Sequence, residues 1–208
     1  MKKLIGIFFG AALLFSTSAY SDVTMGVKVG NGDLEGTNAG YTAGSNTYAS
    51  TTASKDSNYG AIFAELGLGD TPVSIGVEFV PLDADISLDG ANASTSANVG
   101  DYLTAYLMYM HDAGNMSVYA KAGFSQADIG AIKSKSTVVS QSSELEGIMI
   151  GAGLQTAELN AGLKGRFEIT YTDFDDISAT TTSNGSASVK KTADGELLTL
   201  TFGLSKSF

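Results

Sequence analysis

The sequence predicts an all-β protein, an eight-stranded antiparallel up-and-down transmembrane β-barrel, and three observations carry this prediction. Eight segments of about 9–12 residues alternate apolar side chains with small or polar ones, the period of a strand with two unlike faces. The connections between them alternate strictly between long polar stretches and short turns. An export-type segment begins the chain, and no later stretch approaches eighteen consecutive apolar residues, which predicts that no helix crosses a membrane.

The N-terminal segment has the composition of a secretory signal peptide. Two lysines precede an apolar run from Leu4 to Phe15, and small residues that suit cleavage follow it up to Ala19. The run is about twelve residues long, shorter than a membrane-spanning helix needs, although a retained N-terminal anchor is the alternative. We therefore expect a signal peptide at residues 1–19 and one outer-membrane β-barrel domain at residues 20–208.

Each expected strand has one apolar face and one small or polar face. In the last segment Leu198, Leu200 and Phe202 alternate with Thr199 and Thr201, a pattern that a soluble edge strand could also show. Residues 101–110 are apolar on both faces, so their inward side stays open at this stage. The expected strands are residues 22–30, 59–69, 73–80, 101–110, 116–124, 146–155, 161–172 and 197–208.

The connections sort by length, which a soluble β-sandwich has no reason to do. Short turns are expected at residues 70–72, 112–115 and 156–160, and long loops at residues 31–58, 81–100, 125–145 and 173–196. An even number of antiparallel strands then predicts both mature termini and the short turns in the periplasm, with the long loops extracellular. The loops are rich in Gly, Ser, Thr and Asn, and we expect them to be mobile.

Four segments resemble the small eight-stranded outer-membrane barrels, namely the membrane domain of OmpA and the OmpX type. They are Val118–Phe124, Gly151–Leu154, Phe167–Phe174 and the C-terminal strand ending in Phe208. The resemblance covers the whole mature chain and implies a Gram-negative outer-membrane location, lipid and lipopolysaccharide as partners, and a monomer. It does not extend to the C-terminal peptidoglycan-binding domain of OmpA, so tethering to the cell wall is not implied.

The same resemblance implies an assembly signal at the C-terminus. Terminal aromatic strands of such barrels are read by the barrel-assembly machinery, and here Phe202, Gly203 and Phe208 would form that signal. Lys206 stands where the family usually has an aromatic or aliphatic residue.

Charged residues recur on the polar faces of the expected strands, where they must point into the lumen. On the lipid-facing surface each would cost about 2–4 kcal/mol near the bilayer midplane. Because side chains fill an eight-stranded lumen, opposite charges there should pair. We expect Arg166 to pair with Glu78 or Glu65, and Lys121 with a neighbouring carboxylate, closing the lumen; a selectivity or gating element is the alternative. The expected network contains Lys28, Glu65, Glu78, Lys121, Lys164, Arg166 and Glu168.

The composition argues against several functions. The chain has a net charge of −10, no cysteine and a single histidine, which disfavours nucleic-acid binding, disulfides and transition-metal sites, and no cofactor is implied. Some small barrels modify lipid A with a histidine near the outer leaflet, whereas His111 is expected at the periplasmic end of this barrel. We therefore expect no enzyme. The carboxylates at Asp83, Asp85, Asp89 and at Asp173, Asp175, Asp176 lack calcium-loop spacing, and a solvated acidic rim is favoured over a calcium site.

We therefore expect an outer-membrane barrel with a structural or surface-exposed role and a lumen filled by charged and polar side chains. A narrow porin-like channel for small solutes or ions is one alternative. An adhesin or phage receptor that acts through the loops is another.

Overall fold

The structure, a computed structural model, describes residues 22–43, 45–81, 84–90, 93–129, 132–134, 137–139, 143–181 and 189–208. The expected signal peptide lies outside the described residues and stays a prediction. Within the described part, no helix combines the length and the apolar composition that crossing a membrane requires.

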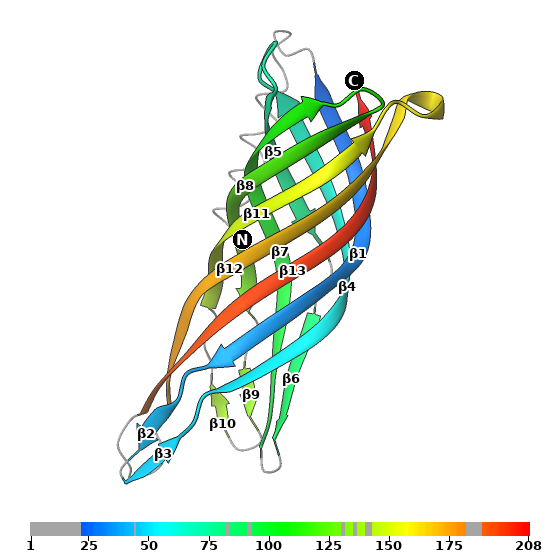
Figure 1. Cartoon of the computed structure of the whole chain (residues 1–208). Helices are drawn as coiled ribbons and strands as arrows, with labels where there is room; N and C mark the ends of the chain where they lie inside the picture. Colours follow the sequence, from blue (N-terminus) through cyan, green and yellow to red (C-terminus); the bar gives the residue numbers. More distant parts are fainter. Residues whose placement is uncertain are drawn as a thin grey trace.

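Eight strands close into an antiparallel up-and-down barrel (Figure 1), which confirms the predicted fold. Each strand pairs with the neighbouring barrel strands in the sequence, and the first pairs with the last. The barrel strands are β1 (Val23–Asn38), β4 (Thr51–Gly67), β5 (Val73–Val80), β7 (Ala93–Asp112), β8 (Met116–Ile129), β11 (Ser143–Thr156), β12 (Leu163–Thr181) and β13 (Val189–Ser207).

Five short strands lie at the end of the barrel away from the C-terminus (Figure 1). We call this end the loop end, and the opposite end, with the short turns and the C-terminus, the turn end. The short strands are β2 (Tyr41–Ala43), β3 (Asn46–Tyr48), β6 (Ala84–Gly90), β9 (Ile132–Ser134) and β10 (Thr137–Val139). β2 pairs with β3, while β6 and β9 both extend the sheet from β7.

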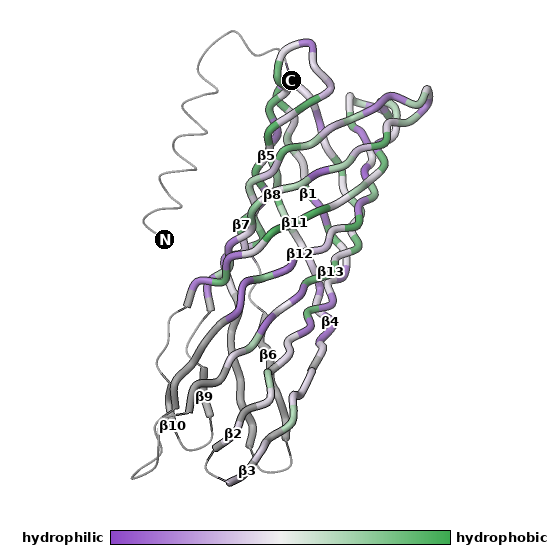
Figure 2. The backbone as a smooth tube through the Cα atoms, turned by 60° about the vertical axis from the view of Figure 1, so that its left-hand side comes forward, coloured by the Kyte–Doolittle hydropathy of each residue, from purple (hydrophilic) through white to green (hydrophobic). Residues whose placement is uncertain are grey.

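The outer wall of the barrel is apolar, as the period of two predicts. Val29, Phe124 and Ile148 are 64%, 74% and 59% exposed, whereas inward neighbours such as Lys28 and Ser125 are 3% exposed. Hydrophobic residues gather in the turn-end part of the tube, and polar ones become more frequent toward the loop end (Figure 2). A band of apolar side chains therefore surrounds the turn-end part of the barrel, as contact with lipid requires.

The strands run much further than predicted, and this corrects the expected loops. β1 continues to Asn38 and β4 begins at Thr51, so much of residues 31–58 forms a ladder rather than a loop. The same holds for parts of the other three expected loops. A hairpin ladder needs paired backbone groups but no apolar side chains, and Thr37 and Thr52 even bond across it through their hydroxyls at 2.9 Å. Low hydrophobicity was therefore a poor guide to where these strands end.

The turn end differs from the prediction only at its edges. Gly69 and Gly114 have φ angles of 61° and 87°, a conformation that glycine adopts without strain, and they occupy the first two turns. Asp112, expected as the first residue of the second turn, belongs to β7, as His111 does. A short 3₁₀ turn, η1 (Asn160–Gly162), lies in the third connection, so β12 starts at Leu163 rather than at residue 161.

The burial of its side chains shows which face of β7 points into the lumen, a question that the sequence left open. Tyr106 and Met108 are buried and point inward, whereas Leu107 and Tyr109 are more than half exposed on the outer wall. A register irregularity between Gly100 and Leu103 separates this part of the strand from its loop-end extension.

Candidate functional site

Two lysines and two glutamates from four strands meet in the middle of the lumen. Lys28 Nζ on β1 lies 2.6 Å from both Glu78 Oε2 on β5 and Glu168 Oε1 on β12. Lys121 Nζ on β8 lies 3.0 Å and 2.7 Å from the same two oxygens. Each of the four side chains is at most 4% exposed. Positive and negative groups thus alternate around a closed square, which we call the charge quartet.

Two tyrosines complete the hydrogen bonding of the charge quartet. Tyr59 donates its hydroxyl proton to Glu78 Oε1 at 2.7 Å, and Tyr119 donates to Glu168 Oε2 at 3.0 Å. Every carboxylate oxygen of the quartet therefore has a donor, and its four formal charges cancel. Because a buried charge is tolerated when it is paired and fully hydrogen-bonded, the quartet can close the lumen without an unpaired charge.

An arginine–glutamate pair lies beside the quartet on the turn-end side. Arg166 holds both oxygens of Glu65 through its two terminal nitrogens, each at 2.7 Å, and its Nε donates to Gln155 Oε1 at 2.8 Å. Tyr106 donates to Glu65 Oε1 at 2.8 Å. The planar guanidinium also faces the Phe63 ring at 4.8 Å. This two-point contact fixes both side chains across the barrel in one arrangement.

Glycines on the inner wall make room for the tyrosines of this layer. A Cβ atom at Gly76 would lie 2.4 Å from the Tyr106 ring, and one at Gly153 would lie 2.3 Å from the Tyr119 ring. The aromatic rings therefore lie directly over glycine backbone, which any larger residue would prevent. Each of these glycines pairs with its tyrosine across two neighbouring strands. Tyrosines and glycines on the polar faces of adjacent expected strands were the signal that could have identified these hydrogen-bond donors.

β12 passes through successive layers of the lumen. Its inward residues run from Lys164 through Arg166 and Glu168 to two buried threonines and then Phe174. Beyond the quartet, hydroxyl groups bond one another, as where Tyr102 contacts Ser125 at 3.0 Å and Thr172 at 2.9 Å. The lumen thus changes from charged to hydroxyl-lined to apolar toward the loop end.

An apolar cluster fills the loop-end part of the lumen. It consists of side chains from six barrel strands, and its Tyr102 and Phe174 rings pack edge to face, with centroids 6.1 Å apart. We call this cluster the apolar cap. Its members are Tyr59, Ala61, Val80, Tyr102, Ala127, Leu145 and Phe174, with Leu34 and Leu197 packed against them.

A polar vestibule opens the lumen at the turn end. It has a volume of about 520 Å³, and Glu65 and Arg166 lie among the residues that line it. Lys164 also lines this vestibule and is half-buried; among the described residues it forms no ion pair. The structure therefore brings six of the seven proposed lumen charges into contact and leaves Lys164 outside that network.

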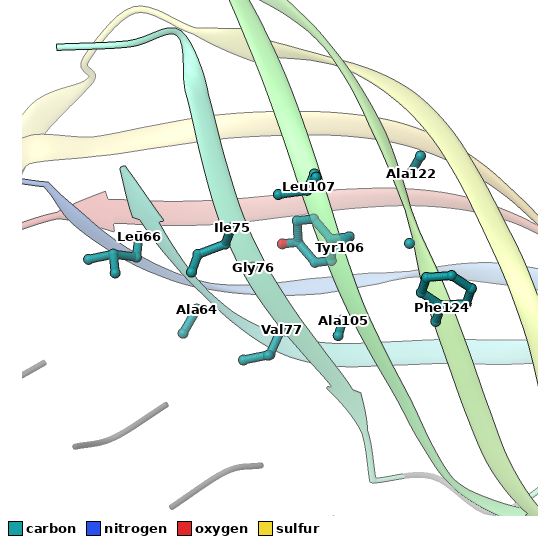
Figure 3. A pocket seen from close by; sticks show the side chains of 11 residues that line it. Ala64, Leu66, Ile75, Gly76, Val77, Ala105, Tyr106, Leu107, Ala122 and Phe124 are labelled. Carbon is teal, nitrogen blue, oxygen red and sulfur yellow. The ribbon is translucent and has the colours of Figure 1, made fainter. Parts of the chain in front are cut away.

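A second depression lies on the outside of the barrel and is unrelated to the lumen. The small side chains Ala64, Ala105 and Ala122 and the larger Ile75 and Phe124 line it, from β4, β5, β7 and β8 (Figure 3). All five belong to the apolar outer wall. The groove is therefore a feature of the lipid-facing band.

The proposed assembly residues lie on the closing strand. Phe202 and Phe208 are 57% and 69% exposed on the outer wall and at the terminus. Gly203 faces inward, where a Cβ atom would lie 2.9 Å from Lys28 Cγ. The Phe208 backbone N–H donates to the Val23 carbonyl at 2.8 Å, so the last residue still belongs to the barrel closure. Their role in assembly stays a prediction.

The acidic runs do not form a metal site in the described part of the chain. No three carboxylate, imidazole or thiol side chains converge there in a way that could hold an ion. Asp173, Asp175 and Asp176 are exposed, and Asp83 lies outside the described residues. His111 is exposed at the turn end.

Comparison with known proteins identifies the fold. The sequence matches no protein-family model and no curated protein. Neisserial surface protein A (NspA) is similar at 11% sequence identity and a TM-score of 0.52, over 90% of this chain and 97% of that one. Outer membrane protein AlkL in lipid bilayers is similar at 13% identity and a TM-score of 0.56, over 93% of each chain. The outer membrane protease OmpT of Escherichia coli is similar at 10% identity and a TM-score of 0.51, over 93% of this chain and 99% of that one. At such identities the likeness concerns the fold alone. The resemblance predicted from the sequence is thus confirmed for the architecture: this chain has the fold of the outer-membrane β-barrels, in an eight-stranded form.

Proposed function

We propose that this protein is a non-conducting integral protein of the bacterial outer membrane, with a structural and surface-exposed role. The observation that carries the proposal is the filled lumen, in which the charge quartet, the Arg166–Glu65 pair and the apolar cap lie one behind another. Side chains that fill an eight-stranded barrel leave no continuous path for water or ions.

The apolar band supports insertion into a membrane. Seven of the eight barrel strands are 14 to 20 residues long, whereas a tilted crossing needs about 9–11. The band covers the turn-end part, so the remaining polar length of these seven strands extends into water. By analogy with barrels of this kind, the turn end and the termini face the periplasm, and the loop end lies outside the cell among lipopolysaccharide.

The closed ladder supports a monomer. Each of the eight barrel strands pairs on both sides over its turn-end part, so no strand edge remains within the apolar band to recruit a second copy. We further propose that the chain is not an enzyme, because its single histidine, His111, is exposed at the end away from the extracellular surface.

The strand extensions favour one second role, recognition of another surface. Paired strands such as residues 31–38 and 51–58 present exposed polar side chains beyond the apolar band. An ordered polar platform suits adhesion or phage attachment better than it suits conduction. Removing residues 37–52, with Gly36 joined to Ala53 by a two-residue turn, should leave the barrel intact and reduce only such binding.

Localisation and topology can be tested in intact cells. We expect the protein to fractionate with the outer membrane and to migrate differently on gels before and after heating. Cysteine placed at Ser94 should react with an impermeant reagent from outside, and cysteine at Ala113 should not. Labelling at Ala113 alone would invert the topology, and recovery as a soluble periplasmic protein would overturn the membrane assignment.

The assembly signal has its own test. Deleting Phe208 should slow or abolish barrel assembly, because the terminal aromatic residue is proposed to be read by the barrel-assembly machinery. Replacing Phe208 by Tyr keeps an aromatic terminus and should preserve assembly. Normal assembly after the deletion would remove Phe208 from the signal.

A further inference from the structure

The apolar cap contains a cavity that lumen closure alone does not explain. The cavity has a volume of about 70 Å³ and lies against Leu34, Val80, Leu145 and Leu197. Interiors of outer-membrane barrels are ordinarily polar. The paired charges and hydroxyl groups of this lumen follow that rule, although a second apolar cluster, which includes Met108 and Met149, also lies inside the barrel. The apolar cap differs from that cluster in containing a cavity lined by apolar side chains.

The two tyrosines in the cavity wall contribute rings rather than hydroxyl groups. The Tyr59 hydroxyl is committed to Glu78 at 2.7 Å. The Tyr102 hydroxyl is committed to Ser125 and Thr172 at 3.0 Å and 2.9 Å. Both groups thus belong to the polar layers below the cap, and their rings line the cavity beside Phe174.

Water is a poor occupant for this space. A buried water typically needs two to four polar partners, and the wall consists almost wholly of aliphatic and aromatic carbon. Enclosed cavities with such walls stay dry and take up apolar molecules, and one of about 150 Å³ binds benzene or xenon. The present cavity is open on one side, where Ser57 and the exposed Asn58 lie, and the remainder of its wall is apolar. At roughly half that volume, the present cavity suits xenon or a short hydrocarbon.

The barrel wall beside the cavity is not sealed by a ladder. The hydrogen-bonded register of β4 with β5 ends at the pair Ile62–Phe79, and Val80 is the last residue of β5. Beyond that pair, among the described strands, residues 51–61 of β4 pair with β1 only. Ser57, Asn58 and Tyr59 lie on this unpaired side and line the cavity. A small molecule can therefore reach the cavity without breaking the barrel ladder.

We propose that the cavity of the apolar cap is a binding site for a small hydrocarbon. This site is separate from the charge quartet and needs neither conduction nor catalysis. It adds a ligand to a protein whose proposed role is otherwise structural.

The test uses the full barrel in lipid nanodiscs under xenon and, separately, under n-butane. Methyl groups of Val80, Leu145 and Leu197 are followed by NMR as the gas pressure rises. Lipid-facing methyl groups of Val27 and Ile148 serve as internal references, because both gases also dissolve in the bilayer. We expect saturable shifts at the cavity methyls with both gases and linear shifts at the reference methyls.

A matched pair of variants assigns the site. Gly32→Ala places a methyl group against the cavity wall, 3.3 Å from Leu197 Cδ1, and should weaken the binding of both gases about fourfold, the factor for one methylene-sized apolar contact. Gly36→Ala on the same strand meets no atom closer than 3.9 Å and should leave binding unchanged.

Three results would overturn the proposal. Linear shifts at the cavity methyls with both gases would mean that the cavity takes up no ligand. Saturation with xenon but not with butane would show a void too small for hydrocarbons. Equal binding in the wild type and in a folded Gly32→Ala variant would place the gas elsewhere.

Discussion

The two halves of the lumen are closed by different physics. Toward the turn end, closure rests on ion pairs, each of which depends on a named partner, as in the charge quartet and the Arg166–Glu65 pair. Toward the loop end, closure rests on the volume of the apolar cap. Losing one charge leaves an excess of the opposite charge buried in the lumen, whereas losing apolar volume only enlarges a space that already exists. The charged half should therefore be the less tolerant of single substitutions.

The largest effect is expected at Glu78, which accepts bonds from Lys28, Lys121 and Tyr59. Glu78→Ala leaves two lysines to share Glu168 and should lower the free energy of unfolding by about 3–5 kcal/mol. Urea unfolding in lipid vesicles, followed by far-UV circular dichroism, measures it. Glu146→Ala, an exposed outward position on β11, is the control and should change little. Equal effects at both positions would mean that the quartet is hydrated.

Arg166→Ala should lower the free energy of unfolding somewhat less, by about 3 kcal/mol. The substitution leaves Glu65 without its ion-pair partner, but the vestibule lets water reach that carboxylate. If the variant keeps its stability, water admitted at this layer is expected to raise the conductance instead, so both quantities should be measured on the variant. Exchanging the two charges, with Arg166→Glu and Glu65→Arg together, should restore much of the original behaviour. An Arg166→Ala protein with an unchanged urea midpoint and no conductance would show that this pair does not close the lumen.

The apolar half should respond less sharply. Leu145→Ala removes buried volume next to the existing cavity and should lower the free energy of unfolding by about 2–3 kcal/mol, the lower part of the range for buried leucines. Leu154→Ala on the same strand is the matched control, because Leu154 is 43% exposed on the outer wall. A cost at Leu145 as large as that at Glu78 would erase the contrast between the two halves.

Tyr59 has its ring in the apolar cap and its hydroxyl group in the charged half. A change that removes only the hydroxyl group therefore measures its contribution to stability apart from that of the ring. Tyr59→Phe keeps the ring in the apolar cap but removes the bond to Glu78, which retains both lysines. The expected loss is about 1.5 kcal/mol, typical of a hydrogen bond to a charged group. Tyr109→Phe on the outer wall should cost almost nothing. No loss at Tyr59 would mean that the hydroxyl is replaced by water.

The sequence predicted the charged half better than the apolar one. Inward-facing charges stand out on a period-two pattern, because lipid excludes them from the other face. The sequence could not show which opposite charges pair, because strand tilt and stagger place residues with the same position along their strands at different depths in the barrel. Glu65 and Glu78 were both possible partners of Arg166, and the structure pairs Arg166 with Glu65.

The apolar cap was missed for a different reason. Leu34, Ala127, Leu145 and Phe174 all lie in stretches that were expected to be loops, because single apolar residues among Ser, Thr and Asn show no period. Only the pairing of the extended strands brings them together. The same extension explains why the expected loops were too long.

Single-channel recording tests the central claim, a lumen closed by two independent layers, most directly. The wild-type barrel, refolded and incorporated into a planar lipid bilayer, should show no stable conductance steps over the voltage range that the bilayer withstands, in molar potassium chloride. Reproducible steps of one size from correctly folded, heat-modifiable protein would contradict the account, because they require a continuous water path through both the charge quartet and the apolar cap.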